Sequence, residues 1–218
     1  EDEHGKQTIE FRDKAGRVVF KKVQLTANRD TGPGSHGPGG WLNTYYMYDD
    51  RGNLRCVLQP EGTYQFLYNV GIGALAPTNS IKINILNEFC FRYEYDQRNR
   101  MIMKQVPGKG TEEMVYDQRD RLVMSRDAAQ TAQGVWNVFK YDELNRLAKI
   151  GLITSSSSRA THQSSSDGNI NYPTLASGDV MQENYYDDYL WITAPTPQDG
   201  IGRTLFTGDI YAAFFLTS

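Results

Sequence analysis

The chain has 218 residues, enough to bury a sizeable core in one domain or two small ones. Its 23 Lys and Arg against 26 Asp and Glu give a formal charge of −3, which argues against a protein that tracks nucleic-acid phosphates. No apolar run approaches the roughly 18 residues of a membrane-spanning helix. The unusual feature is tyrosine, with 14 Tyr beside 9 Phe and 3 Trp, and this excess needs an explanation.

A short motif that begins with aspartate recurs five times along the chain. The residue three positions after the aspartate is Gly, Asn or Asp, and in four of the five copies the next residue is Arg. The aspartates and their third following residues are Asp13 with Gly16, Asp49 with Gly52, Asp96 with Asn99, Asp117 with Asp120, and Asp142 with Asn145. Gly, Asn and Asp enter left-handed backbone at low cost, and an aspartate side chain starts a turn by accepting from the backbone. Each copy therefore predicts strand, tight turn, strand.

The segments beside the turns have the composition and alternation of β-strands. In chain order, the predicted strands include 54–58, 63–70, 89–95, 101–103, 122–124 and 135–141. No stretch shows comparable helical periodicity, and residues 80–87 are expected to form one helical turn or two. We predict an all-β fold of repeated antiparallel hairpins, forming a curved, shell-like sheet with little helix.

The spacing of the motif predicts an array with insertions. Successive aspartates lie 36, 47, 21 and 25 residues apart, and a weaker copy at Asp187 follows after 45 more, which fits a unit of 21–25 residues with expanded copies. Such repeats imply hairpins that stack on their neighbours. We predict a hairpin region over 1–153 with a Gly/Pro loop at 30–40. A mobile serine-rich loop over 154–171 and a further hairpin segment over 172–218, continuing the same array, complete the predicted organisation.

A tyrosine directly precedes the aspartate in most copies, and with it the unit resembles that of the RHS/YD-repeat family. The family unit reads Tyr-Asp-x-x-Gly-Arg-Leu with a second Tyr two residues upstream, and residues 93–101 (YEYDQRNRM) are the closest copy. Residues 2–11 and 44–49 resemble the Bacteroidetes-type branch. The resemblance covers residues 1 to about 150 well and 180–193 weakly, and the run of five copies makes it specific.

The resemblance implies β-sheets that spiral into hollow shells, as in bacterial polymorphic toxins, insecticidal toxin complexes and teneurins. It implies a structural segment of a large secreted or cell-surface bacterial protein, without catalysis of its own. The implied partners are neighbouring YD repeats of the same polypeptide and an enclosed C-terminal toxin domain. The self-cleavage motif of RHS cores, built on Asp-Pro, is absent, because no Asp precedes a Pro. The chain thus resembles an upstream slice of a shell, too short to close one.

The aromatic residues leave open a module that binds carbohydrate or a cell surface. The residues that could stack on a ligand are Trp41, Tyr45, Tyr64, Trp136 and Trp191. Strand aromatics more often form cross-strand pairs, however. A glycoside hydrolase is a more distant alternative, because it needs two carboxylates that face each other. The adjacent pairs Asp49-Asp50, Glu112-Glu113 and Asp187-Asp188 instead point to opposite faces of a strand.

No motif predicts a cofactor, a metal ion, a nucleic-acid partner or a catalytic residue. Residues 70–76 (VGIGALA) match a dinucleotide fingerprint, but Pro77 stops the helix into which that turn must open. The three histidines lie far apart, without metal-ligand spacing. Cys56 and Cys90 lie among apolar strand residues, which favours buried thiols and leaves a disulfide open in an oxidising compartment.

Overall fold

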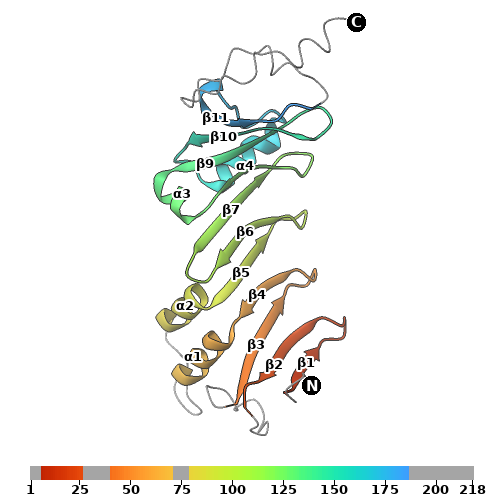
Figure 1. Ribbon diagram of the computed structural model, residues 1–218, viewed down its shortest axis with the longest axis vertical. Helices are drawn as coiled ribbons and strands as arrows, with labels where there is room; N and C mark the ends of the chain where they lie inside the picture. The colour runs from red at the N-terminus through yellow and green to blue at the C-terminus, as the bar shows by residue number, and fades with distance from the viewer. Residues whose placement is uncertain (1–5, 27–39, 71–78, 187–218) are drawn as a thin grey trace, which may run out of the picture. The chain divides into compact units, whose positions relative to one another are not determined.

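The computed structural model describes residues 6–26, 40–70 and 79–186, and in them the chain forms one antiparallel sheet of eleven strands (Figure 1). The strands are β1 (Thr8–Arg12), β2 (Val18–Gln24), β3 (Trp41–Tyr48), β4 (Leu54–Leu58), β5 (Cys90–Tyr95), β6 (Met101–Val106), β7 (Gly110–Tyr116), β8 (Leu122–Arg126), β9 (Val135–Tyr141), β10 (Leu147–Thr154) and β11 (Val180–Glu183). Their order in the sheet follows the sequence without a crossover, and within the described residues β1 and β11 do not pair with each other. The sheet is therefore open, and the predicted all-β class of antiparallel hairpins is confirmed.

The five predicted turns connect pairs of strands at one end of the strands, and three of the helices lie at the opposite end. Figure 1 shows these turns on the right and the helices α1 (Pro60–Val70), α2 (Asn79–Glu88) and α3 (Ala128–Gln133) on the left. At the left edge, β6 and β7 are joined by only three residues, 107–109, whereas β4 and β5 are joined through α1 and α2. The long interval between the Asp49 and Asp96 copies of the motif thus reflects α1 and α2, which are inserted between β4 and β5.

Helical segments replace two of the predicted elements and lengthen a third. Residues 63–70, predicted as a strand, belong to α1, so that prediction is wrong. Pro60 lacks the N–H that a continuing strand would donate and is well suited to the first turn of a helix. A Cβ on Gly62 would meet Phe89 Cβ at 2.6 Å and Leu58 Cδ1 at 2.7 Å, so this glycine lets α1 pack closely. Residues 79–88 form a full ten-residue helix, α2, instead of one or two turns.

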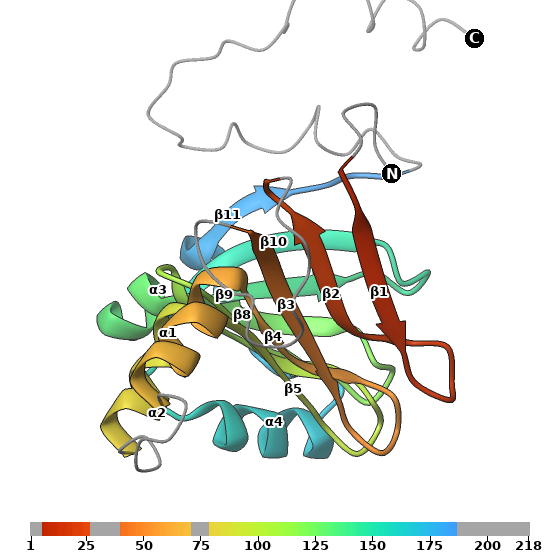
Figure 2. The same cartoon turned by 90° about the horizontal axis from the view of Figure 1, so that it is seen from below.

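The serine-rich segment 154–171 is also not the plain loop that was predicted, because it contains α4 (Arg159–Gly168). The Ser158 side chain caps this helix by accepting a hydrogen bond from Thr161 N at 3.2 Å. His162 and Ser166, one helical turn apart, are its buried residues. Capping and burial of one face outweigh the weak helix propensity of serine. Figure 2 shows α4 lying along the sheet, where it packs against β7.

The buried residues form two clusters, each beneath helical segments. The first comprises Val115, Val123, Met124, Trp136 and Val138. His162 of α4 meets the edge of the Trp136 ring at 4.8 Å between centroids, which ties α4 to this cluster. The second cluster comprises Leu58, Ile85 and Cys90, beside α1 and α2.

Residues 1–183 form one compact unit and 184–218 a second, most of which lies outside the described residues. A short 3-10 helix, η1 (Ser177–Asp179), and β11 are the described elements of the predicted segment 172–218 that follow α4. The continuation of the array past residue 186, the weaker motif copy at Asp187 and most of the loop 30–40 fall on residues that the structure does not describe. They remain predictions.

The two cysteines lie on one face of neighbouring strands, where they could form a disulfide. Leu58 pairs with Cys90 and Cys56 pairs with Arg92, so the cysteines are diagonal neighbours between β4 and β5. A hydrogen bond between the two thiols raises the pKa of Cys90 and lowers the pKa of Cys56. Both are reduced in the structure.

We expect oxidised glutathione to convert this pair into an intramolecular disulfide, because the more acidic Cys56 supplies the attacking thiolate. The free-thiol count of the unfolded chain should fall to none, and the free energy of unfolding should rise by about 2–4 kcal/mol. Thiol titration before and after oxidation measures the first, with Cys56→Ser as control. Two titratable thiols after prolonged oxidation would contradict the pairing.

Candidate functional site: a ladder of aspartate turns

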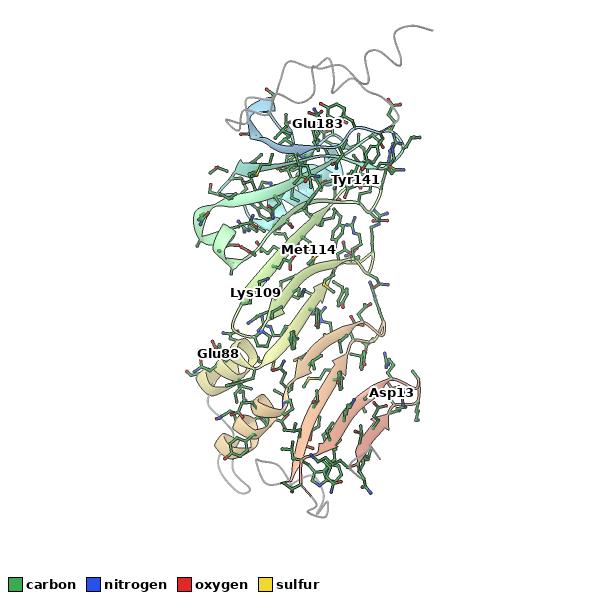
Figure 3. All side chains as sticks on the ribbon, in the orientation of Figure 1. Asp13, Glu88, Lys109, Met114, Tyr141 and Glu183 are labelled. Atoms are coloured by element: carbon green, nitrogen blue, oxygen red, sulfur yellow. The ribbon has the colours of Figure 1, made fainter. Side chains whose placement is uncertain are left out.

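The five motif copies form turns with one common backbone geometry. We number them turn 1 to turn 5 by their aspartates, which are Asp13, Asp49, Asp96, Asp117 and Asp142. The residues at the third following position have positive φ angles: Gly16 (80°), Gly52 (85°), Asn99 (59°), Asp120 (62°) and Asn145 (63°). All ten predicted turn residues thus lie at the same end of the strands, opposite the β6–β7 connection. Figure 3 labels Asp13 and Tyr141 on the side of the turns and Lys109 on the opposite side.

Within a turn, the aspartate organises both the backbone and the following arginine, as turn 4 shows. Asp117 Oδ1 accepts hydrogen bonds from the backbone N–H groups of Arg119 and Arg121, each at 2.9 Å. Its Oδ2 accepts from Arg121 Nε and faces a second guanidinium nitrogen, both at 2.7 Å. The Asp117 side chain is fully buried. Turns 1, 3 and 5 repeat the bonds to Oδ1 and the Nε–Oδ2 bond.

Between turns, the same arginine and the tyrosine of the next unit lock one hairpin to its neighbour. The Arg121 guanidinium lies 4.8 Å from the centre of the Tyr141 ring and donates to Asn145 Oδ1 at 2.8 Å. The Tyr141 hydroxyl in turn donates to Leu122 O at 2.8 Å. The tyrosine of turn 5 is therefore held by the side chain and by the backbone of turn 4.

The arginine–tyrosine contact recurs twice more. Arg100 lies 5.0 Å from the ring centre of Tyr116, whose hydroxyl donates to Met101 O at 2.7 Å. Arg17 lies 4.8 Å from the ring centre of Tyr48, whose hydroxyl donates to Val18 O at 3.2 Å. A cation above an aromatic ring contributes about 0.5–2 kcal/mol, depending on burial. Tyr48, Tyr116 and Tyr141, each of which precedes the aspartate of a turn, thus serve as links between hairpins, which explains part of the tyrosine excess.

A second arginine, whose role was not predicted from the sequence, also forms hydrogen bonds to the next turn. It stands two residues after the aspartate in turns 2, 3 and 4. Arg98 of turn 3 donates to Asp120 Oδ2 at 2.7 Å and to Gln118 O at 3.4 Å. Arg51 of turn 2 donates to Gln97 O at 2.9 Å. The repetition of this arginine in three consecutive copies is visible in the sequence. The groups that it binds in the next turn are known only once the hairpins are placed side by side.

Every hairpin of the ladder also contains a β-bulge beside its turn. In the hairpin of turn 4, Val115 pairs with Met124 but Tyr116 pairs with Leu122, so one residue of β8 has no partner on β7. The hairpins of the other four turns shift register at the equivalent place. Bulges increase the local twist of a strand pair, so their repetition gives each hairpin the same additional twist.

The candidate ligand-stacking residues do not form one surface. Trp41 is 2% exposed and Trp136 is completely buried, so the prediction that they stack on a ligand does not fit these two residues. The Lys22 ammonium lies 5.1 Å from the ring centre of Trp41, and the Arg126 guanidinium lies 4.0 Å from that of Trp136.

The remaining candidates are scattered as well. Tyr45 of β3 stacks on Phe20 with 4.4 Å between ring centroids. Tyr64 belongs to α1, and Trp191 lies outside the described residues. The five residues therefore do not meet in a common platform within the part of the chain that the structure describes.

The carboxylates of the adjacent pair Glu112 and Glu113 each face a cation. Glu113 Oε2 lies 2.6 Å from Arg126 Nε, and Glu112 Oε2 lies 3.9 Å from Lys104 Nζ. Among the described residues, no group of three or more His, Cys, Asp or Glu could hold a metal ion. In the same residues, none of the helices combines the length and the apolar character needed to cross a membrane.

Replacing Gly52 with Val is expected to lower the free energy of unfolding by about 1–3 kcal/mol, because a β-branched residue is strained at positive φ. Gly52→Asn is the matched control, since turns 3 and 5 carry Asn in this position and should tolerate it. Urea denaturation of the two variants measures the difference. Equal stability of the valine and asparagine variants would show that φ at this position does not matter.

Acid is expected to destabilise the chain in two stages. Burial lowers the pKa of His162, so its contribution, complete above the ordinary value of about 6.5, diminishes below that pH. The Arg17 side chain holds the pKa of Asp13 below its usual value, and hydrogen bonds from Arg146 outweigh the opposing effect of burial at Asp142. Stabilisation by these carboxylates is complete above about pH 4 and is lost as the pH falls through their lowered pKa values. Urea denaturation between pH 3 and pH 8 tests this, and stability that increases below pH 4 would contradict it.

Comparisons with known proteins give a structural likeness alone. No protein-family model and no curated protein matches the chain. Among solved structures, the crystal structure of TcdB2-TccC3-Cdc42 matches with 17% identity and a TM-score of 0.46, over 69% of this chain and 6% of that one. The structure of the Photorhabdus luminescens Tc holotoxin pore matches with 16% identity and a TM-score of 0.47, over 69% and 6%. The chain spans only a small part of these proteins, and a likeness of this extent does not carry a function across.

Proposed function

We propose that the chain is a structural segment of an RHS-type YD-repeat shell, a scaffold without catalysis of its own. The observation that supports this proposal is the turn ladder. The repeat is defined by tyrosine, aspartate and arginine. The polar groups of these residues bind one another within each turn and hold consecutive hairpins together. In turns 1, 3 and 4 the arginine of the repeat lies over the tyrosine of the next unit.

The chemistry of turn 4 illustrates why a structural role fits best. Both oxygens of Asp117 are engaged by Arg119 and Arg121, and the Arg121 guanidinium is also engaged by turn 5. A buried aspartate whose two oxygens are held by a guanidinium and two backbone N–H groups is fixed in one position, which suits a structural element.

The proposed parent is a large secreted or cell-surface bacterial protein in which further YD repeats continue the sheet. The proposed partners are those repeats and a C-terminal toxin domain that the shell encloses. The open sheet supports this, because β1 and β11 each pair with only one strand among the described residues. Edge strands present unpaired backbone groups on which further strands can add.

Carbohydrate or cell-surface adhesion was the alternative, and the burial of Trp41 and Trp136 removes two of its five candidate residues. The ion pairs of Glu112 and Glu113 likewise weaken the glycoside hydrolase alternative. Neither alternative gains a specific observation from the described residues.

The test compares this chain with the full protein encoded by its gene, using hydrogen–deuterium exchange. If the chain is a shell segment, the β1 amides that face away from β2 exchange rapidly in the chain alone and become protected in the full protein. Unchanged exchange at β1 and β11 in the full protein would contradict a continuing shell. Turnover of a glycoside panel by the chain, lost on replacing a single carboxylate, would overturn the scaffold proposal.

A further inference from the structure

Turn 2 departs from the other four at the residue after its glycine. Turns 1, 3, 4 and 5 carry Arg there, whereas turn 2 carries Asn53. Asn53 Nδ2 donates to Asp49 Oδ2 at 3.1 Å and to Asn99 Oδ1 at 3.2 Å. The amide thus replaces two of the hydrogen bonds that an arginine makes in this position. The neutral amide forms no ion pair with Asp49, however, and it cannot make the cation–π contact with Tyr95, the tyrosine of turn 3.

A pocket lies where the guanidinium group is missing. It has a volume of about 340 Å³ and is lined by Asp49, Arg51, Asn53, Tyr95, Asp96, Gln97 and Asn99. The pocket therefore lies between turns 2 and 3, above the ring that an arginine of turn 2 would cover.

The occupied version of this site is visible between turns 3 and 4. There, the Arg100 guanidinium is held by its own aspartate, by the Tyr116 ring, by Asp117 O at 3.1 Å and by Asp120 Oδ1 at 2.9 Å. The residues that correspond to these four partners in turns 2 and 3 are Asp49, Tyr95, Asp96 and Asn99. All four line the pocket.

We propose that this pocket binds a guanidinium group, supplied by an arginine side chain of a protein partner or by a small guanidinium compound. The bound group would lie on the Tyr95 ring, pair with Asp49, and donate to Asp96 O and Asn99 Oδ1. The planar, multiply donating guanidinium suits this set of acceptors better than an ammonium ion does. This assignment goes beyond the scaffold role and does not depend on it.

Two cations already lie at or near the pocket and limit the affinity. Arg51, which lines the pocket, donates to Gln97 O at 2.9 Å and to Asn99 Oδ1 at 3.5 Å. Arg55 acts electrostatically on both Asp49 and Tyr95. The dissociation constant is therefore expected to be on the order of 1–10 mM, as suits a half-open site with one ion pair and one cation–π contact.

The test is a titration of the ¹⁵N-labelled chain with methylguanidinium chloride, followed by amide chemical shifts at constant ionic strength. The site predicts saturable shifts of Gly52, Asn53 and Asn99 amides, with at least fivefold weaker binding of methylammonium chloride. Asn53→Arg supplies the missing group within the chain, so it should abolish the shifts and raise the thermal midpoint. Equal, non-saturating shifts with both salts, or unchanged binding to Asn53→Arg, would overturn the proposal.

A reciprocal variant tests the same site chemistry elsewhere. Arg121→Asn copies turn 2 into turn 4 and should create a second methylguanidinium site over Tyr141, with partial recovery of the lost thermal stability at about 10 mM ligand. Failure of Arg121→Asn to gain a site would contradict the assignment. A third titrant, N-acetyl-arginine N-methylamide, separates the two sources: tighter binding than methylguanidinium indicates a protein partner, and equal binding indicates a small guanidinium compound.

Discussion

Replacing Asp117 with Ala is expected to lower the free energy of unfolding by about 3–5 kcal/mol, because it removes one partner of a buried ion pair. The substitution leaves the backbone N–H groups of Arg119 and Arg121 without their acceptor. It also leaves the Arg121 guanidinium, which is 17% exposed, without its counter-charge. Urea denaturation monitored by circular dichroism measures the loss.

Two controls separate the ladder from a general effect of losing a carboxylate. Asp13→Ala makes the same change in turn 1, where the aspartate is 24% exposed, so its effect should be smaller. Asp117→Asn keeps the size of the side chain and one acceptor oxygen and should fall between wild type and Asp117→Ala. A loss for Asp117→Ala no larger than that for Asp13→Ala would contradict the burial argument.

Replacing Trp136 with Ala is expected to lower the free energy of unfolding by about 3–5 kcal/mol, because it leaves a large cavity in the core beneath α4. The Trp136 ring is fully buried, and it contacts Arg126 on one side and His162 on another. Loss of the ring should therefore also loosen α4, which amide exchange of residues 159–168 would reveal.

The matched control for this second substitution is Leu144→Ala in turn 5. Leu144 is 69% exposed, so its truncation should change stability by less than about 0.5 kcal/mol. If the two alanine variants had similar stabilities, Trp136 would not hold the core together.

The sequence was sufficient to predict the hairpins because each turn is determined by residues within five positions of one another. An aspartate that accepts from its own turn, and a Gly, Asn or Asp at positive φ, act locally and can be read from the chain. α1 and α4 could not be predicted in this way. Thr63 and the alternating residues after it fit a strand as well as a helix. The serine-rich segment forms α4 because Ser158 caps it and because His162 and Ser166 are buried.

The links between turns were also beyond the sequence, since they join residues from different hairpins. That Tyr141 donates to Leu122 O depends on the register of β8 against β9, which no local pattern specifies. The pocket beside turn 2 depends on an unusual residue that the sequence does show. The exceptional Asn53 was visible in the sequence, but its meaning follows only from seeing where Arg100 and Arg121 lie in the other turns.

Consecutive turns should be energetically coupled, and a double-mutant cycle between Arg121 and Tyr141 measures this coupling most directly. The cycle compares the free energies of unfolding of wild type, Arg121→Met, Tyr141→Leu and the double variant, so that the loss of the Arg121–Asp117 pair cancels. We expect a coupling energy of about 1 kcal/mol or more. A coupling energy within error of zero would contradict this, because the contact between Arg121 and Tyr141 would then contribute nothing to the link between turns 4 and 5.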